Sequence, residues 1–320
     1  MINNLAKKLY FNTIRIRLIE QRIIKEYKNQ KIRCPVHLSI GQEAISSPLK
    51  LIFNKNDFVI SNHRSHAHYL GKGGNLKKFI AELYGKKSGC SGGRGGSMHL
   101  TDKKCGFIAS TPIVANSIPV GVGLSLSKLI KKENGVVIIF FGDAAVEEGV
   151  FFESLNFAIL KKLKIIFVCE NNLYSVYSKF SVRQPNNRKI HKMVSGFGIK
   201  TINSNGNDFE KNYKIYKKAY DYVNKNHKPI FIEYLTYRFI EHCGPNDDDN
   251  LSYRKKKEIS TWKKKDPIEN FENKNFISTS AFKDGLIKKI SHEIDEAFKF
   301  SKLAKFPSKK SAYSKLYAKK

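Results

Sequence analysis

The pattern of apolar residues is clearest in the middle of the chain, between residues 136 and 174. The runs over 136–141 and 165–169 are continuously apolar, which is typical of strands buried on both faces of a parallel sheet. Between them, Phe151, Leu155 and Ala158 recur at the spacing of one helix face. The pattern therefore predicts a strand–helix–strand unit.

Each of the two predicted strands ends at polar residues, Gly142-Asp143 in the first case and Asn171-Asn172 in the second. Parallel strands joined by a helix have their carboxyl ends at the same edge of the sheet, so we expect Asp143 and Asn172 to lie side by side. A carboxylate and an amide oxygen suit Mg²⁺, and the helix N-terminus beside them favours a phosphate. The unit predicts a metal and phosphate site.

The rest of the hydrophobic pattern predicts helices and strands that surround this unit. In chain order they are a helix over 3–28, a short strand from 58, a helix that opens near Pro119, a helix over 208–225, a strand over 230–237 and a helix over 281–303. We expect one α/β domain over 1–320, with a mostly parallel sheet flanked by helices and with helical extensions at both ends. Its parts are a core over about 35–240, a polar loop over 238–254 and a helical tail over 281–303.

The formal net charge of +30 is the unusual feature of the composition. Such a charge suits a nucleic-acid or anionic-membrane partner. The lysines are scattered, however, and no nucleic-acid-binding motif accompanies them. We therefore expect solvated lysine-rich faces, no nucleic-acid partner and no membrane partner, and a basic nucleic-acid-binding protein stays the remote alternative.

The cysteines and the N-terminal residues indicate a compartment. Five cysteines are an odd number, and no CxxC pair occurs among them, so neither a disulfide framework nor a zinc site is expected. The first 21 residues contain no uninterrupted apolar core, which argues against a signal peptide or a membrane span. We expect a cytoplasmic protein.

Other polar segments carry candidate chemistry. His63, Arg64 and His66 follow the predicted strand at 58, and Arg and His after a strand end suit a phosphate or a carboxylate. The glycine-rich loop over 89–99 could cradle phosphates but lacks the GKS or GKT ending of a nucleotide P-loop. Glu43 is either catalytic or, as we favour, a first-turn residue that the helix dipole stabilises.

These segments together resemble the alpha subunit of the 2-oxo acid dehydrogenases, the thiamine-dependent decarboxylating component of the pyruvate, branched-chain and acetoin complexes. Gly142-Asp143, followed by Asn171-Asn172, is similar to the thiamine-diphosphate motif of that family. The stretches HLSIGQEA (37–44), GRGGSMHL (93–100) and YR (253–254) occur in the family's order. The resemblance covers about residues 5 to 300. It implies a thiamine-diphosphate-binding fold with thiamine diphosphate and Mg²⁺ as cofactors.

The resemblance also implies a role for particular residues. Mg²⁺ would be bound by Asp143, Asn172 and the main-chain oxygen of Tyr174. His242 and His66 are the catalytic candidates, for proton transfer or for steadying the substrate carboxylate or a lipoyl group; a role of His242 as a phosphate ligand only is the alternative. The cofactor-binding set is His63, Arg64, Ile113, Val114, Gly142, Asp143, Ala144, Ala145, Asn172, Tyr174, Arg238 and His242.

Three positions depart from the family's pattern. Ala144 stands where the metal motif usually has Gly, and a positive φ there would be strained. His63 stands where the family usually has Tyr. Cys243 stands where animal enzymes carry a phosphorylated Ser, so that mode of regulation is not expected.

The resemblance implies a pyruvate dehydrogenase that decarboxylates the 2-oxo acid and passes the acyl group to lipoamide. The loop Gly244-Pro245-Asn246 favours the alternatives, which are a related thiamine enzyme for acetoin, for branched-chain 2-oxo acids or for a biosynthetic carboligation. Thiamine chemistry needs a carboxylate that protonates the aminopyrimidine, and the chain has no second α/β half to carry it. In the family a beta subunit supplies that group, so we expect an α₂β₂ assembly, with a lipoyl acyltransferase core as a further partner.

Overall fold

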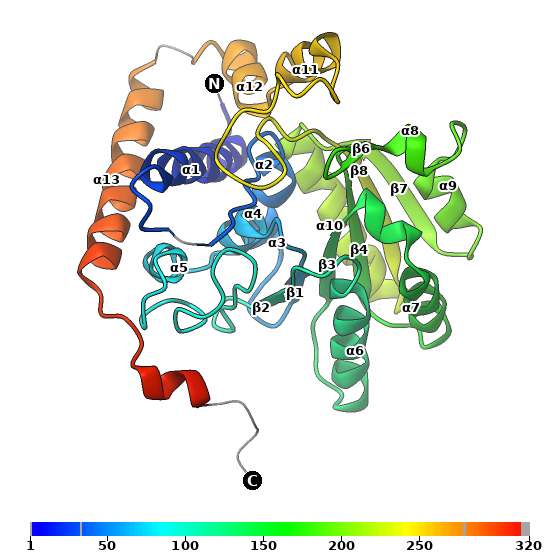
Figure 1. Cartoon of the computed structure of the whole chain (residues 1–320). Coiled ribbons are helices and arrows are strands. Elements are labelled where there is room, and N and C mark those ends of the chain that lie inside the picture. Colours follow the sequence, from blue (N-terminus) through cyan, green and yellow to red (C-terminus); the bar gives the residue numbers. More distant parts are fainter. Residues whose placement is uncertain (1, 33, 278–279, 315–320) are drawn as a thin grey trace.

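A six-stranded parallel sheet forms the centre of the computed structural model, which describes residues 2–32, 34–277 and 280–314 (Figure 1). The strand order is β2-β1-β3-β4-β8-β7, and every pair in it is parallel. The prediction of a mostly parallel sheet flanked by helices is confirmed. The strands are β1 (Phe58–Ser61), β2 (Phe107–Ser110), β3 (Val137–Gly142), β4 (Ile165–Asn171), β7 (Lys200–Asn205) and β8 (Ile230–Leu235), and β5 (Tyr174–Ser175) and β6 (Ser178–Lys179) form a separate hairpin.

Alternate side chains of β3 and β4 divide the core into two clusters, one on each face of the sheet. Ile138 and Phe140 belong to the larger cluster, whereas Val137 and Ile139 belong to the smaller one. This alternation is the period-two geometry of a strand with both faces covered. The larger cluster includes residues of α1 (Asn4–Tyr27), α4 (His66–Gly71), α5 (Leu76–Leu83) and α10 (Phe209–Asn226), and the smaller one includes residues of α6 (Ser117–Ile130), α7 (Gly149–Leu160) and α9 (Ile190–Ser195).

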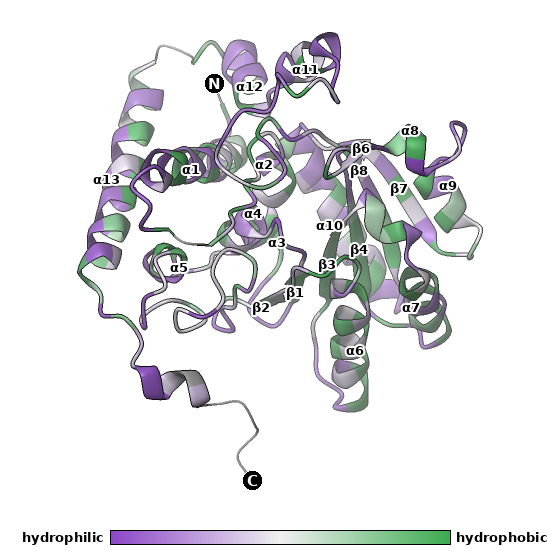
Figure 2. Cartoon of the chain, in the orientation of Figure 1, coloured by the Kyte–Doolittle hydropathy of each residue, from purple (hydrophilic) through white to green (hydrophobic). Residues whose placement is uncertain are grey.

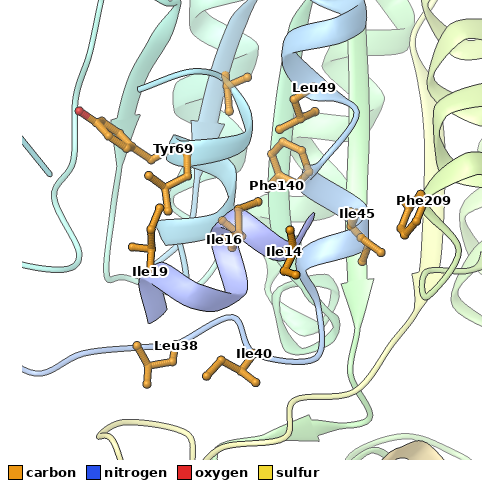
Figure 3. Packing of buried hydrophobic residues seen from close by; sticks show 14 of the residues in the cluster. Ile14, Ile16, Ile19, Leu38, Ile40, Ile45, Leu49, Tyr69, Phe140 and Phe209 are labelled. Atoms are coloured by element: carbon orange, nitrogen blue, oxygen red, sulfur yellow. The ribbon is translucent and has the colours of Figure 1, made fainter. Parts of the chain in front are cut away.

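Apolar side chains from the N-terminal part of the chain cover the first face. Figure 3 shows Phe140 of the sheet among isoleucines of α1, with Leu38 and Ile40 of the following segment close by. The full burial of a side chain such as Phe140 contributes about 1.5–3 kcal/mol. Figure 2 shows that the central strands β3 and β4 are mainly hydrophobic, whereas the edge strand β7 and the outer helices carry many hydrophilic positions.

The first and last long helices, α1 and α13, agree closely with the ranges predicted from the sequence. The N-terminal helix α1 is capped by Asn3, whose side chain accepts the N–H of Ala6 at 2.8 Å. At the other end, α13 (Ala281–Leu303) packs on α1 and α5 and has the bounds that the periodicity predicts. None of the helices in the described part of the chain is long and apolar enough to span a membrane.

Two helices after the polar loop were not predicted. They are α11 (Lys256–Lys263) and α12 (Pro267–Asn275). Their sequences are mostly polar and have a weak apolar stripe. Asp266-Pro267 is nevertheless a cap signal, since Asp266 accepts the N–H of Ile268. The short helices that complete the chain are α2 (Glu43–Ser46), α3 (Leu49–Ile52), α8 (Phe180–Arg183), η1 (Asp143–Glu147) and η2 (Lys309–Tyr313).

Candidate functional site

A cavity opens at the carboxyl edge of the sheet, where the chain leaves β1 in one direction and β3 in the other. This switch in strand order is where open α/β sheets bind ligands. Predicted residues that line the cavity are His63, Arg64, Val114, Gly142, Asp143, Ala144, Ala145, Asn172, Tyr174 and His242. They are joined by His37, Gln42, Asn62, Met98, Pro112, Ala115, Phe141, Glu170, Ser175 and Val176.

One side of the cavity, which we call the carboxylate wall, consists of Asp143, Ala144, Ala145, Asn172 and Tyr174. Strands β3 and β4 pair in register up to Gly142 and Glu170, so the residues that follow them meet at one edge. The side-chain oxygen of Asn172 accepts the backbone N–H of Tyr174 at 3.2 Å, and its amide nitrogen donates to Gln42 at 3.3 Å. The wall therefore presents hard oxygen donors held by local backbone geometry.

Ala144 fits the turn that it occupies. It lies in η1, a right-handed 3₁₀ turn, and it is not among the residues with a positive φ. The strain expected of a left-handed Ala144 does not arise here. The backbone N–H groups at the start of this turn remain available as donors beside the cavity.

The carboxylate of Asp143 is buried beneath the cavity surface and paired with an arginine. Arg183, from the short helix α8, donates a hydrogen bond to Oδ2 of Asp143 and another to Glu147. Burial raises the pKa of Asp143 above its ordinary value, and the charge of Arg183 opposes that shift. No pattern in the sequence pointed to Arg183.

The opposite side, which we call the imidazole wall, consists of His37, His63, Arg64 and His242. The ring centroids of the three histidines lie 4.7, 5.2 and 5.4 Å apart. Arg64 joins the segments, because its guanidinium donates to the carbonyl of Leu38 at 2.6 Å and to that of His242 at 3.0 Å. Three stretches far apart in the sequence thus form one surface.

The imidazole wall carries its positive charge on Arg64. Burial lowers the pKa of His63 to about 4 and that of His242 to about 3, and the charge of Arg64 adds to both shifts. The pKa of His37 is lowered to about 2 for the same reasons. At neutral pH each ring is therefore neutral, with one nitrogen donor and one acceptor. Such a wall suits an anion held by Arg64 and N–H donors.

Arg238 lies behind the cavity and does not line it. Its guanidinium donates to the carbonyls of Ile240 and Val176 and pairs with Asp248 at 3.2 Å. The side chains of Arg238 and Asp248 are both 1% exposed. In this arrangement Arg238 holds the loop that carries His242 in place.

Ile113, which was predicted to bind the cofactor, is 64% exposed and does not line the cavity.

The structure does not bring His66 to the cavity. Its ring is fully buried, with Nδ1 2.9 Å from a carboxylate oxygen of Glu20 and Nε2 2.7 Å from the hydroxyl of Ser97. Both nitrogens are engaged, so neither is free to contact a substrate. This network ties α1 and α4 to the glycine-rich loop.

Several lining residues were missed by reasoning from the sequence. His37 is 7% exposed and its Nδ1 has no hydrogen-bond partner in the described structure. Its place at the start of HLSIGQEA was a usable signal. Glu170 is also buried, and it contacts His68 at 3.1 Å, whose other nitrogen lies 2.8 Å from Ser61. A charged residue at the end of a buried strand could have indicated it.

Glu43 does not line the cavity. It is fully buried, forms an ion pair with Arg17 and accepts the N–H of Gly41 at 3.0 Å. Glu43 is the first residue of α2, so the prediction of a first-turn position is confirmed. Its burial is explained by the ion pair with Arg17 and the bond to Gly41.

The chain is similar to known proteins over nearly its whole length. The family model described as "Dehydrogenase E1 component" matches residues 12–310. The pyruvate dehydrogenase E1 component subunit alpha of Rickettsia bellii is 33% identical over 314 residues, which cover 97% of this chain and 95% of the relative. The same subunit of Porphyra purpurea is 34% identical over 303 residues, which cover 92% of this chain and 87% of the relative. The chloroplastic pyruvate dehydrogenase E1 component subunit alpha-3 of Arabidopsis thaliana is 31% identical over 320 residues, which cover 97% of this chain and 74% of the relative.

Proposed function

The chain belongs to the dehydrogenase E1 component family, and from this premise we propose that it is the alpha subunit of a pyruvate dehydrogenase. The family implies a thiamine-diphosphate-binding fold and an oxidoreductase activity, in agreement with the prediction from the sequence. The observation that carries the proposal is the convergence of the carboxylate wall and the imidazole wall on one cavity. A metal on one side, with an arginine and N–H donors on the other, suits a bound diphosphate.

The carboxylate wall fits the metal. Asp143, Asn172 and the main-chain oxygen of Tyr174 would hold Mg²⁺, since all three are oxygen donors and the carboxylate of Asp143 is buried beside the cavity. The N–H groups of Ala144 and Ala145 would bind diphosphate oxygens at the start of the η1 turn. The bound thiamine diphosphate supplies the electron sink for the loss of CO₂.

The imidazole wall would bind the diphosphate from the other side. Arg64 supplies the charge and His63 an N–H donor, while Arg238 adds its field from behind. His242 would steady the substrate carboxylate with an N–H donor or move a proton to or from the substrate, because its ring lines the cavity. Val114, which lines the cavity, would lie along the aminopyrimidine ring, and Ile113 lies beyond the lining.

A beta partner would complete the site. The carboxylates that line the cavity within the described residues are those of Asp143 and Glu170, and both stand at the metal end of the sheet. Both are already engaged, Asp143 by Arg183 and Glu170 by His68. Several apolar side chains are exposed on α6, on α7 and in the segment before α6. They are Ile113, Val114, Val120, Leu129, Ile130 and Leu160. We propose that a beta subunit covers this surface in an α₂β₂ assembly and provides the missing carboxylate.

The substrate and the acceptor are proposed from the relatives. The alpha subunits that resemble this chain are named for pyruvate dehydrogenase, which supports pyruvate as the 2-oxo acid. Lipoamide, carried by a lipoyl acyltransferase, is the acceptor that the resemblance to the family implies. The loop after His242 favours a second candidate, an enzyme for acetoin, branched-chain 2-oxo acids or a carboligation. There Gly244 has a φ of +126° and packs on Glu241, so the turn depends on glycine.

All five cysteines are free, which supports a cytoplasmic setting.

The test is to produce the chain with and without a beta subunit of the same family and to assay 2-oxo acids with an artificial electron acceptor. We expect no decarboxylation by the chain alone and pyruvate decarboxylation by the assembly. His242→Ala should reduce turnover at least 100-fold, in line with the loss of a general acid–base group, while the exposed His292→Ala should not. Full activity of the isolated chain would refute the shared site, and an assembly inactive with pyruvate but active with another 2-oxo acid or acetoin would replace the substrate.

A further inference from the structure

Arg183 bridges two acidic side chains at the start of the η1 turn. Its Nη2 donates to Oδ2 of Asp143, its Nη1 donates to Oε1 of Glu147, and its Nε donates to the carbonyl of Ser178 at 3.3 Å. The three nitrogens of the guanidinium therefore each hold a different group. This fork extends across the turn from its first residue to its last.

The bridge is largely shielded from water. The side chain of Arg183 is 12% exposed and that of Asp143 is 2% exposed. The guanidinium also lies over the ring of Phe180, 5.8 Å from its centroid. Exposed ion pairs contribute little, but this guanidinium is shielded and its rigid fork is held at three separate groups. The contact is therefore expected to immobilise the Asp143 carboxylate.

Only one oxygen of Asp143 is engaged by the arginine. Arg183 takes Oδ2, and Asp143 lines the cavity, so Oδ1 is the oxygen available to a ligand there. We propose that Arg183 is a positioning residue for the metal-binding carboxylate: it fixes Asp143 and the η1 turn so that Oδ1 and the N–H groups of Ala144 and Ala145 face the cavity together. The proposal rests on the proposed function, in which Asp143 binds the metal of a metal–diphosphate pair.

The opposite role would give the opposite result. If Arg183 were instead a counter-cation that the metal must displace, removing it would tighten metal binding. A positioning residue that holds the far oxygen of a metal ligand should, when removed, weaken metal binding by about 10- to 100-fold. The sign of the change therefore decides between the two roles.

The experiment measures Mn²⁺ binding to the αβ assembly by electron paramagnetic resonance of the free ion, with thiamine diphosphate at saturation. We expect Arg183→Gln to weaken Mn²⁺ binding about 10- to 100-fold and Arg183→Lys to weaken it less, because Lys keeps the charge but not the fork. Arg188→Gln is the matched control, since Arg188 is exposed on the same segment and contacts Gln184. It should leave the affinity within about twofold, as expected of an exposed side chain.

Unchanged or tighter Mn²⁺ binding by folded Arg183→Gln would overturn the proposal. If that variant does not fold, Arg183→Lys and Glu147→Gln decide, because both weaken the bridge while keeping one anchor, and unchanged binding in both would overturn it equally. A wild-type assembly that binds no Mn²⁺ with thiamine diphosphate would instead overturn the proposed function. The two failures are therefore distinguishable.

Discussion

The two walls of the cavity are built in different ways. The carboxylate wall comes from one strand–helix–strand unit, and the register between β3 and β4 is enough to bring its residues together. The imidazole wall comes from three segments, near residues 37, 63 and 242, which are joined by buried polar contacts of Arg64. The first wall is a consequence of backbone topology, whereas the second depends on side chains that must all be satisfied. They should therefore respond differently to mutation.

The largest effect is expected on the side of the imidazole wall. Asp248 lies between Arg238 and Arg254, and the side chains of all three are 1% exposed. Asp248→Asn removes the carboxylate that pairs with the buried Arg238 and leaves Arg254 with Asp249 at 3.3 Å, so we expect a loss of about 3–5 kcal/mol in the free energy of unfolding. Urea denaturation measures it.

The matched control for that variant is Asp221→Asn. Asp221 pairs with Lys217 on the surface, where its side chain is 58% exposed, and its removal should change the free energy of unfolding by less than about 0.5 kcal/mol. A loss below about 1 kcal/mol in Asp248→Asn would mean that the remaining contacts, with backbone carbonyls, Tyr253 and Asp249, are enough to hold the loop of His242. The contrast between the walls would then be weaker than we infer.

A smaller loss is expected behind the same wall, at His66. Replacing it with Gln removes at least one of its bonds to Glu20 and Ser97 and leaves a buried polar group unsatisfied, at a cost of about 1–3 kcal/mol. Because the ring does not reach the cavity, turnover per folded assembly should stay within a few-fold of the wild type. Thermal unfolding and steady-state kinetics measure the two effects separately. A large fall in turnover with unchanged stability would restore His66 as a catalytic residue.

The sequence revealed the carboxylate wall better than the imidazole wall for a physical reason. Strand ends can be read from a local apolar run, so Asp143 and Asn172 could be paired from the sequence alone. The approach of His37 to His242 depends on long-range packing that no local pattern encodes, and only the resemblance to a family brought His63, Arg64 and His242 together. Neither the local pattern nor the family resemblance identified Arg183, because its position beside Asp143 depends on the path of the chain through the hairpin β5–β6.

The pH dependence of stability should distinguish the walls. The pKa of His63 in the folded chain is about 4, below the ordinary value near 6.5. The folded state therefore favours the neutral ring, and this contribution to stability is present above about pH 6.5 and is lost as the pH falls towards 4. His63→Gln should flatten the fall in melting temperature over that range relative to the wild type. The exposed His292→Gln is the control, and equal slopes in all three proteins would contradict the assignment.

The smallest effect is expected at Val176, a cavity-lining residue in the turn between β5 and β6. This residue has a φ of +51°, which is unfavourable for a β-branched side chain, while its carbonyl accepts a hydrogen bond from Arg238 at 2.9 Å. Asn tolerates this conformation, so Val176→Asn should raise the free energy of unfolding by about 0.5–1 kcal/mol, seen as a small rise in melting temperature. Val182→Asn, at an exposed site in α8 without a positive φ, should give no such rise. If Val176→Asn is more stable but binds Mn²⁺ and thiamine diphosphate less tightly, the strain at this turn serves the site, because the carbonyl of Val176 links the hairpin of the carboxylate wall to the arginine behind the imidazole wall.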